Sequence, residues 1–349
     1  MGADTHAKPN CACRCDAPVC RNVRNGPTQG RHIVPRLLIT RPLPDKVVEA
    51  AKARFEVTMR SENTPLSKDE MVSALDEFDA VLPTLGDAFS ADVFPQGPRC
   101  KILANFGVGF NHIDAAAARK AGIEVTNTPG AVTDATADIA MTLMLMTCRR
   151  AGEGERMVRA GEWAGWHPTQ LLGMHVTGKT LGVVGMGRIG KAISRRAQAG
   201  FGMKVVFFNR SKVSDPGVEG TQMDRLEDVM ATADVVVLAV PASPQTHHLI
   251  DAAALGAMSP DSHLINIARG DVVDEAALIS ALQEGRIAGA GLDVYEFEPK
   301  VSEALCAMEN VTLLPHLGTS AQEVREEMGM MAVANLVAFF DGAKVPNPV

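Results

Sequence analysis

Three features that the sequence lacks narrow the classes of protein that it can encode. Aromatic residues make up only 4% of the chain, and acidic residues outnumber basic ones by 41 to 34. We find no basic stripe with interleaved aromatic side chains, so nucleic-acid binding and attachment to an anionic membrane are disfavoured. No apolar run approaches the roughly 20 residues that a membrane crossing needs.

A secretory signal is also missing from the N-terminus, which has no charged start followed by an apolar segment and a small-residue cleavage site. We therefore expect a cytoplasmic protein. Three of the seven cysteines, Cys100, Cys148 and Cys306, are scattered among apolar residues. In a reducing compartment they are expected to be small core residues.

The other four cysteines, Cys11, Cys13, Cys15 and Cys20, lie in a tail rich in Pro, Asn, Gly and Arg. Their spacing matches no common structural zinc pattern, although His6 is nearby. The composition predicts that residues 1–32 form a disordered or artefactual tail. A metal-binding regulator that uses Cys11–Cys20 is the alternative, and it predicts stoichiometric zinc in the purified protein.

From Arg36 onward the sequence alternates short apolar runs with helical patterns. This alternation predicts parallel strands joined by crossover helices, and the nearly continuous Val, Ile, Leu and Ala of the later strands predict a sheet covered on both faces. Ser67 and Glu70 predict a capping box, and we expect 149–178 to be less regular. The expected strands are 36–40, 55–59, 80–83, 101–105 and 124–127, then 180–185, 205–209, 234–240, 263–268, 288–294 and 311–315. The expected helices include 45–54, 114–121, 134–148 and 321–340.

A glycine pattern, Gly185-Met186-Gly187-Arg188-Ile189-Gly190, stands between an expected strand and an expected helix. In that context it is the fingerprint of a dinucleotide site. Gly185 permits the tight turn, Gly187 lets the backbone approach a pyrophosphate, and Gly190 lets the helix pack on the strand. The free N–H groups at the start of the helix would bind the phosphates.

The residues after the next strand favour NADP(H) over NAD(H). An NAD site usually has Asp or Glu there, whereas this chain has Asn209 followed by Arg210 and Ser211. A carboxylate would repel a 2′-phosphate by about 4 kcal/mol per charge pair at 4 Å. Arg210 can bind that phosphate with its fork and Ser211 can add a donor. The alternative is that Arg210 and Lys212 belong to a solvated turn.

At 349 residues and 46% hydrophobic composition, the chain is long enough for two domains. We predict an α/β protein with two Rossmann-like, doubly wound parallel-sheet domains. The cofactor domain, 131–316, is inserted into a discontinuous substrate domain, 33–130 and 317–349. The last helix would leave the cofactor domain and complete the first one.

Three ionisable residues, Arg269, Glu298 and His316, follow late strands, where an open α/β sheet binds its ligands. Hydride delivery to a ketone leaves an alkoxide, and His is the natural proton donor near neutral pH. A carboxylate beside it orients the ring, and an arginine can bind a substrate carboxylate with two parallel hydrogen bonds. This chemistry needs no metal.

Each of the three has an ordinary alternative when taken singly: Arg269 as a surface charge, Glu298 as a loop carboxylate, and His316 as a capping or packed histidine. Their joint position after successive strands, downstream of the glycine fingerprint, favours a catalytic set.

Four motifs together resemble the D-isomer-specific 2-hydroxyacid dehydrogenase family over roughly residues 35–345. They are the glycine fingerprint, IARG at 267–270, GLDVYEFEP at 291–299 and PHLGT at 315–319. The segments 105–114, 127–138 and 163–168 resemble its glyoxylate/hydroxypyruvate reductase branch. This resemblance implies reduction of glyoxylate to glycolate, or of hydroxypyruvate to D-glycerate, by a homodimer joined through its cofactor domains.

By the same resemblance, His316 is the general acid–base, Glu298 its partner and Arg269 the substrate anchor. The backbone of Val108 and Gly109 would bind the substrate carboxylate. Trp166 would reach the partner's active site, or serve as an interface or core aromatic. Asp293 would contact the nicotinamide end, and the other cofactor-lining residues implied are Thr136, Arg188, Ile189, Pro241, Thr246, Ile267, His316 and Gly318.

Two functional alternatives stay open on the sequence. The first is another substrate within the family: a 2-ketogluconate, phosphoglycerate or a bulkier 2-keto acid. The second is a non-enzymatic NADP(H)-sensing protein, like the co-repressors built on this fold. Measurable keto-acid reduction would separate the two.

Overall fold

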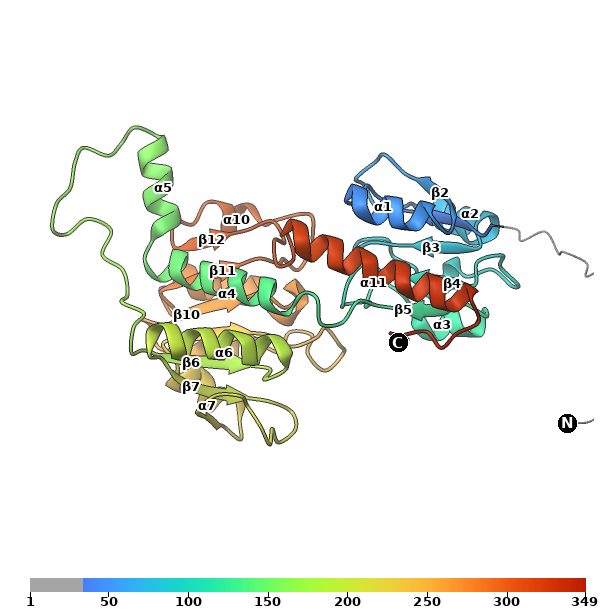
Figure 1. The fold of residues 1–349 in the computed structure, drawn as a ribbon. Helices are drawn as coiled ribbons and strands as arrows, with labels where there is room; N and C mark the ends of the chain where they lie inside the picture. Colours follow the sequence, from blue (N-terminus) through green and yellow to red (C-terminus); the bar gives the residue numbers. More distant parts are fainter. Residues whose placement is uncertain (1–33) are drawn as a thin grey trace, which may run out of the picture. The chain divides into compact units, whose positions relative to one another are not determined.

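Two parallel β-sheets, each with helices on both faces, make up the computed structural model, which describes residues 34–349 (Figure 1). The cysteine-rich tail and the prediction made for it lie outside these residues. All strand pairs in both sheets are parallel, as the alternation of strands and helices predicts.

The first sheet has the strand order β2-β1-β3-β4-β5. Its strands are β1 (Arg36–Ile39), β2 (Glu56–Met59), β3 (Ala80–Leu82), β4 (Ile102–Ala104) and β5 (Glu124–Thr126). The helices between them are α1 (Asp45–Lys52), α2 (Lys68–Glu77), the 3-10 turn η1 (Ala91–Val93) and α3 (Ala115–Lys120).

Successive residues of this sheet point into two different cores, because side chains alternate along a strand. Leu37 and Ile39 pack in one core with residues of α1, and Leu38 packs in the other with residues of α2. Helix α2 begins with the predicted capping box: Ser67 accepts a hydrogen bond from the Glu70 N–H, and Glu70 accepts one from the Ser67 N–H.

The second sheet has the strand order β12-β11-β10-β9-β6-β7-β8. Its strands are β6 (Thr180–Val184), β7 (Lys204–Phe208), β8 (Gly220–Gln222), β9 (Val235–Leu238), β10 (His263–Asn266), β11 (Gly289–Leu292) and β12 (Val311–Leu313). The helices of this part are α4 (Thr133–Cys148), α5 (Ala151–Arg159), α6 (Arg188–Phe201), α7 (Leu226–Thr232), α8 (Ala252–Gly256), the 3-10 turn η2 (Gly270–Val272), α9 (Glu275–Gln283) and α10 (Glu303–Cys306).

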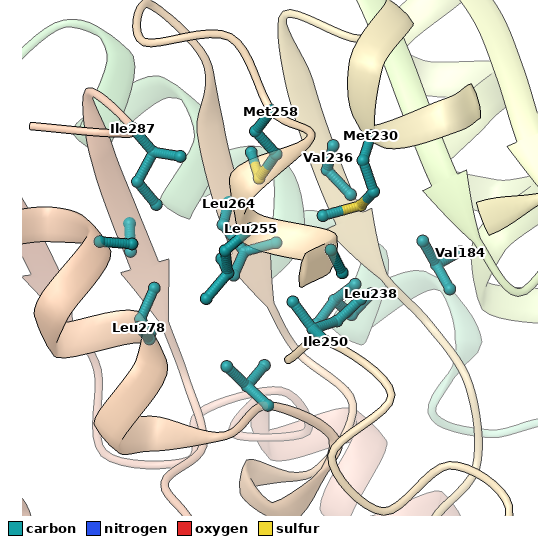
Figure 2. Packing of buried hydrophobic residues seen from close by; sticks show 14 of the residues in the cluster. Val184, Met230, Val236, Leu238, Ile250, Leu255, Met258, Leu264, Leu278 and Ile287 are labelled. Atoms are coloured by element: carbon teal, nitrogen blue, oxygen red, sulfur yellow. The ribbon is translucent and has the colours of Figure 1, made fainter. Parts of the chain in front are cut away.

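The central strands of the second sheet are buried on both faces. On one face, α7, α8 and α9 contribute Met230, Leu255 and Leu278 to a core that also contains Val236 and Leu264 of the sheet (Figure 2). Alternate residues of the same strands pack against α4 and α6 on the other face. A leucine-to-alanine change in such a core costs about 2–5 kcal/mol, so each core stabilises the sheet strongly. The cores on the two faces together hold the ends of the strands in fixed positions.

The chain passes from the first sheet to the second and then returns. Helix α4 packs against α6, β10 and β11, whereas α11 (Gln322–Phe340) packs against α1 and β4. The contact between α1 and α11 is close, since a Cβ built on Gly329 would overlap the side chain of Val47. The expectation that the last helix completes the first part is thus met, while the residue boundaries of the two domains stay a prediction.

One helix was not predicted, and one expectation is wrong. The segment 149–178 contains a helix, α5, which has few apolar residues and carries ion pairs such as Arg150–Glu153 at 2.7 Å. Cys306, expected in a core, is exposed, whereas Cys100 and Cys148 are buried. The reason is that α10 is a single turn whose buried residue is Leu305. Within residues 34–349, none of the helices combines the length and apolar content that a membrane crossing requires.

Candidate active site

The three fingerprint glycines have different surroundings at the turn between β6 and α6. Gly185 has a φ of +99°, and a Cβ on it would lie 2.7 Å from the carbonyl oxygen of Ala239. A Cβ on Gly190 would overlap the carbonyl oxygen of Gly185, whereas one on Gly187 would meet nothing within 4 Å. Gly185 and Gly190 are therefore required by packing, and Gly187 leaves open space beside the start of α6.

That open space lies where the order of the second sheet reverses. Strand β6 pairs with β7 on one side and with β9 on the other, so the chain winds in opposite directions from this point. Open α/β sheets bind ligands at such a switch point, and the first N–H groups of α6 have no partners within the helix. Open space and unpaired donors together fit the pyrophosphate of a dinucleotide.

The residues after β7 form a short turn. It has the amide of Asn209 at the position where an NAD site usually has a carboxylate. Asn209 accepts a hydrogen bond from the Met186 N–H at 3.3 Å and donates to the Ser211 carbonyl at 3.0 Å. This amide links the glycine turn to the segment that carries Arg210, whose side chain is exposed. The turn can therefore receive an anionic group without facing a carboxylate.

The remaining predicted cofactor residues lie at the same edge of the second sheet. The hydroxyl of Thr246 donates to the Pro241 carbonyl at 2.8 Å, which closes the loop after β9. Thr136 donates to the carbonyl of Gly318 at 3.1 Å, and Ile267 is buried after β10. Direct contact of these residues with a cofactor stays a prediction.

His316 and Glu298 form a hydrogen-bonded pair, with 2.9 Å between His316 Nδ1 and Glu298 Oε2. The other carboxylate oxygen, Oε1, accepts the Tyr295 N–H at 3.0 Å. Burial raises the pKa of Glu298, but the hydrogen bond and charge of His316, the Tyr295 N–H and the charge of Arg269 outweigh it, so the pKa is lowered. Glu298 is therefore ionised and holds a proton on Nδ1, which leaves Nε2 of the ring for another partner.

Asp293 fixes the backbone on which His316 stands. Its buried carboxylate accepts the N–H groups of Leu317 at 2.6 Å and Gly318 at 2.8 Å, and its carbonyl accepts the His316 N–H at 2.9 Å. His316 has a φ of +55°, a conformation that few non-glycine residues adopt without such support. Asp293 thus positions the histidine, and its predicted contact with a nicotinamide stays a prediction.

Arg269 lies just after β10 and is half-buried. Its Nη1 donates to the Ala268 carbonyl at 2.7 Å, while Nε is buried and has no hydrogen-bond partner among residues 34–349. Burial lowers the pKa of Arg269, although its high ordinary value keeps it charged. A half-buried cation with an unused buried donor is typical of an anion-binding site, because an unsatisfied buried donor costs about 1–3 kcal/mol.

The loop after β4 brings Val108 and Gly109 to the same place. A Cβ built on Gly109 would overlap Nη2 of Arg269, so the backbone of this loop lies against the guanidinium. Asn105 donates to the carbonyls of Gly107 and Gly109 at 3.0 Å each, and Asn127 donates to the Val108 carbonyl at 2.9 Å. These amides hold the carbonyl groups and leave the N–H groups of Val108 and Gly109 for an anion.

His112 is a residue of this loop that the sequence reasoning did not single out. Its Nε2 lies 3.1 Å from Asn105 Oδ1, and its Nδ1 is buried with no partner in the described part of the chain. Burial lowers the pKa of His112 to about 4, and the charge of Arg269 adds to this effect. The ring is neutral near pH 7. Only its place in the motif NFGVGFNHID could have marked it.

Trp166 does not join this group of residues. It lies in the irregular segment after α5, and its side chain is 79% exposed. The structure thus brings together Arg269, Glu298, His316 and the 105–109 loop, and leaves Trp166 on the surface of the single chain.

Comparison with known sequences identifies the family of the chain. The model of the family "D-isomer specific 2-hydroxyacid dehydrogenase, NAD binding domain" matches residues 141–318. The glyoxylate reductase of Thermococcus kodakarensis is 43% identical over 320 residues, which cover 90% of this chain and 96% of that protein. That of Pyrococcus furiosus is 42% identical over 320 residues, with 90% and 95% covered.

Solved structures give the same result for the fold. A protein of Thermus thermophilus superposes with a TM-score of 0.84 at 41% identity, covering 90% of this chain and 99% of that one. An NADPH-dependent glyoxylate/hydroxypyruvate reductase of Sinorhizobium meliloti, in complex with NADP and malonate, superposes with a TM-score of 0.79 at 35% identity, covering 90% and 97%. The chain belongs to the D-isomer specific 2-hydroxyacid dehydrogenase family.

Proposed function

We propose that this protein reduces glyoxylate to glycolate and hydroxypyruvate to D-glycerate, with NADPH as the preferred cofactor. The observation that carries the proposal is the combination of the His316–Glu298 pair at 2.9 Å with Arg269, whose buried Nε has no partner among residues 34–349. His316 can donate a proton and Arg269 can bind a carboxylate. Reduction of a 2-keto acid needs both functions. Relatives named glyoxylate reductase support this substrate class.

Arg269 would bind the substrate carboxylate through one edge of its fork. Nε and Nη2 share that edge, and the only hydrogen bond of the guanidinium within residues 34–349 comes from Nη1. Two parallel N–H···O bonds to a carboxylate fix both its distance and its plane. The N–H groups of Val108 and Gly109 belong to the loop that lies against Nη2, and they would add donors to the same anion.

His316 would move the proton in the reaction. The nicotinamide, when bound, would supply the hydride to C2 of the keto acid. In the reduction, the protonated ring donates from Nε2 to the carbonyl oxygen, and Glu298 stabilises the positive ring through Nδ1. In the reverse reaction the neutral ring accepts the hydroxyl proton at Nε2. Arg269, held next to the carbonyl by the carboxylate, polarises it further.

The preference for NADPH rests on the turn after β7. Asn209 stands where an NAD site usually has a carboxylate, and the exposed Arg210 and Ser211 follow it. The relative from Sinorhizobium meliloti, whose structure contains NADP, supports the same preference.

We also propose a homodimer joined through the cofactor domains. Four of the exposed large apolar side chains lie on α5 and the segment that follows it: Val158, Trp163, Trp166 and Leu172. Exposed apolar groups gathered on one segment are typical of an interface. Light scattering after size exclusion tests this directly, since a monomeric mass would contradict it.

A panel of keto acids tests the proposed reaction. We would follow NADPH and NADH oxidation with glyoxylate, hydroxypyruvate, a branched keto acid and 2-ketogluconate, with His316→Ala as the matched control. We expect the highest kcat/KM for the two small acids with NADPH, and little turnover in the variant. A preference for the branched acid or for 2-ketogluconate would overturn the substrate assignment, and a preference for NADH the cofactor assignment.

A further inference from the structure

A second group of candidate ligands lies outside the site described above. His247 and His248, in the loop after β9, and Glu296, in the loop after β11, place one ligand atom each within 4.8 Å of the others. We propose that these three side chains bind one divalent transition-metal ion per chain, with Zn²⁺ as the ion that best fits the donor set. This inference does not depend on the proposed reaction.

The three side chains are already oriented toward one another. His248 Nε2 lies 2.8 Å from Glu296 Oε1, and the rings of His247 and His248 stack with 4.0 Å between centroids. His248 has a φ of +49°, a conformation that few non-glycine residues adopt. This unusual backbone occurs at the residue whose ring stacks on that of His247. Side chains that are fixed before binding lose less entropy when an ion arrives.

Glu275 is hydrogen-bonded to Glu296, the carboxylate ligand of the proposed site. Glu296 Oε2 accepts the Glu275 N–H at 3.1 Å, and Glu275 Oε2 accepts the Glu296 N–H at 3.3 Å. Glu275 is only 8% exposed. These two hydrogen bonds hold Glu296 in place beside His248. Hydrogen bonds to the backbone also orient the metal-binding carboxylate.

The donor types select the metal. Two imidazole nitrogens and one carboxylate oxygen suit Zn²⁺, whereas Ca²⁺ and Mg²⁺ prefer oxygen donors alone. Bond lengths of about 2.0–2.2 Å place tetrahedral ligands about 3.3 Å apart. The His248–Glu296 pair, at 2.8 Å, must therefore open by about half an ångström on binding. The ion would replace the proton that this pair shares, and water would complete the coordination.

The proposed site braces the turn that carries Arg269. The His248 N–H donates to the Asp271 carbonyl at 2.8 Å, and a Cβ built on Gly270 would overlap the backbone nitrogen of Glu296. The two segments that supply the ligands therefore hold the same turn from both sides. An ion that links them would resist separation of these segments and stabilise the folded chain.

The test is zinc binding by the full chain, measured by isothermal titration calorimetry and by metal analysis after dialysis. Because the N-terminal tail contains cysteines, the background protein carries C11S, C13S, C15S and C20S. We compare His247→Gln, Glu296→Gln and, as a matched control, His175→Gln, which changes another exposed histidine.

We expect one Zn²⁺ per chain in the background protein and in His175→Gln, with an increase in Tm on zinc addition. His247→Gln and Glu296→Gln should each weaken binding at least tenfold and lose the Tm increase. The Co²⁺ complex should show no thiolate charge-transfer band, because its ligands are nitrogen and oxygen. Absence of zinc binding in the background protein, or unchanged affinity in both variants, would overturn the proposal.

Discussion

Two histidine–carboxylate pairs in this protein have almost the same geometry and different surroundings. His316 Nδ1 lies 2.9 Å from Glu298, and His248 Nε2 lies 2.8 Å from Glu296. Both histidines have positive φ, 55° and 49°, and both carboxylates come from one loop. The pairs differ in the ring nitrogen that meets the carboxylate and in the groups nearby.

The surroundings assign the two pairs different chemistry. The charge of Arg269 contributes to the lowered pKa of Glu298. The buried carboxylate of Asp293 holds the loop of His316 at the edge of the second sheet where ligands are expected to bind. His248 instead has a second imidazole, His247, stacked on its ring. A histidine–carboxylate pair is therefore not a catalytic signature by itself. A neighbouring guanidinium with unused donors favours acid–base catalysis on an anion, and a neighbouring imidazole favours a metal ion.

The strongest test of this contrast replaces each histidine in turn. His316→Ala should lower kcat for glyoxylate reduction by roughly 10²–10⁴-fold, because the proton donor is lost. His248→Ala should lower it by less than about tenfold, since that ring is not part of the proposed substrate site. Steady-state kinetics with NADPH measures both, and equal losses in the two variants would remove the distinction between the pairs.

The next test concerns the guanidinium that distinguishes the first pair. Arg269→Lys keeps a positive charge but loses the two-pronged edge, so kcat/KM for glyoxylate should fall by roughly 10²-fold. Binding of NADPH, followed by fluorescence titration, should stay within a factor of a few. A variant with wild-type kcat/KM would show that the substrate carboxylate binds elsewhere.

A smaller effect is expected at the cofactor end of the first pair's site. Arg210→Ala removes a charge-assisted hydrogen bond of about 1.5 kcal/mol, which should raise the KM for NADPH about tenfold. The KM for NADH should change little, because NADH has no 2′-phosphate. An unchanged KM for NADPH would instead place Arg210 in a solvated turn.

A last prediction concerns stability, and a histidine whose Nδ1 has no hydrogen-bond partner among residues 34–349. Burial lowers the pKa of His263 to about 4, and its side chain is 7% exposed. Since the unfolded chain binds the proton more tightly, this group's stabilisation is complete above pH 6.5 and is lost as the pH falls toward 4. The loss is about 3 kcal/mol at most.

Urea unfolding between pH 4 and 7 measures this dependence. His263→Gln should show a flatter decline in the free energy of unfolding than the wild type or His175→Gln does. An identical slope in all three proteins would mean that His263 keeps its ordinary pKa in the fold.

Much of the fold was predictable because its local signals agree with its long-range packing. The apolar runs at β6, β9 and β10 are buried on both faces, and the Ser67–Glu70 capping box begins α2 as expected. Helix α5 was not predicted because surface ion pairs, rather than an apolar stripe, accompany it. Cys306 was misplaced because a one-turn helix gives no periodicity from which to infer its buried side.

The residues of the candidate site also fall into a predictable and an unpredictable group. Arg269, Glu298 and His316 were predictable because each follows a strand and carries a side chain that the chemistry needs. His112 and the ligands around Glu296 were not, since they are brought together by loops from distant parts of the sequence. No short-range pattern reports that Asn105 meets His112 or that His248 meets Glu296.

A crystal structure with NADPH and glycolate tests the central claim most directly. The account predicts the glycolate carboxylate on Nε and Nη2 of Arg269, with the C2 hydroxyl about 2.6–3.2 Å from His316 Nε2. Glycolate bound away from Arg269, or a C2 hydroxyl that faces a group other than His316, would contradict it.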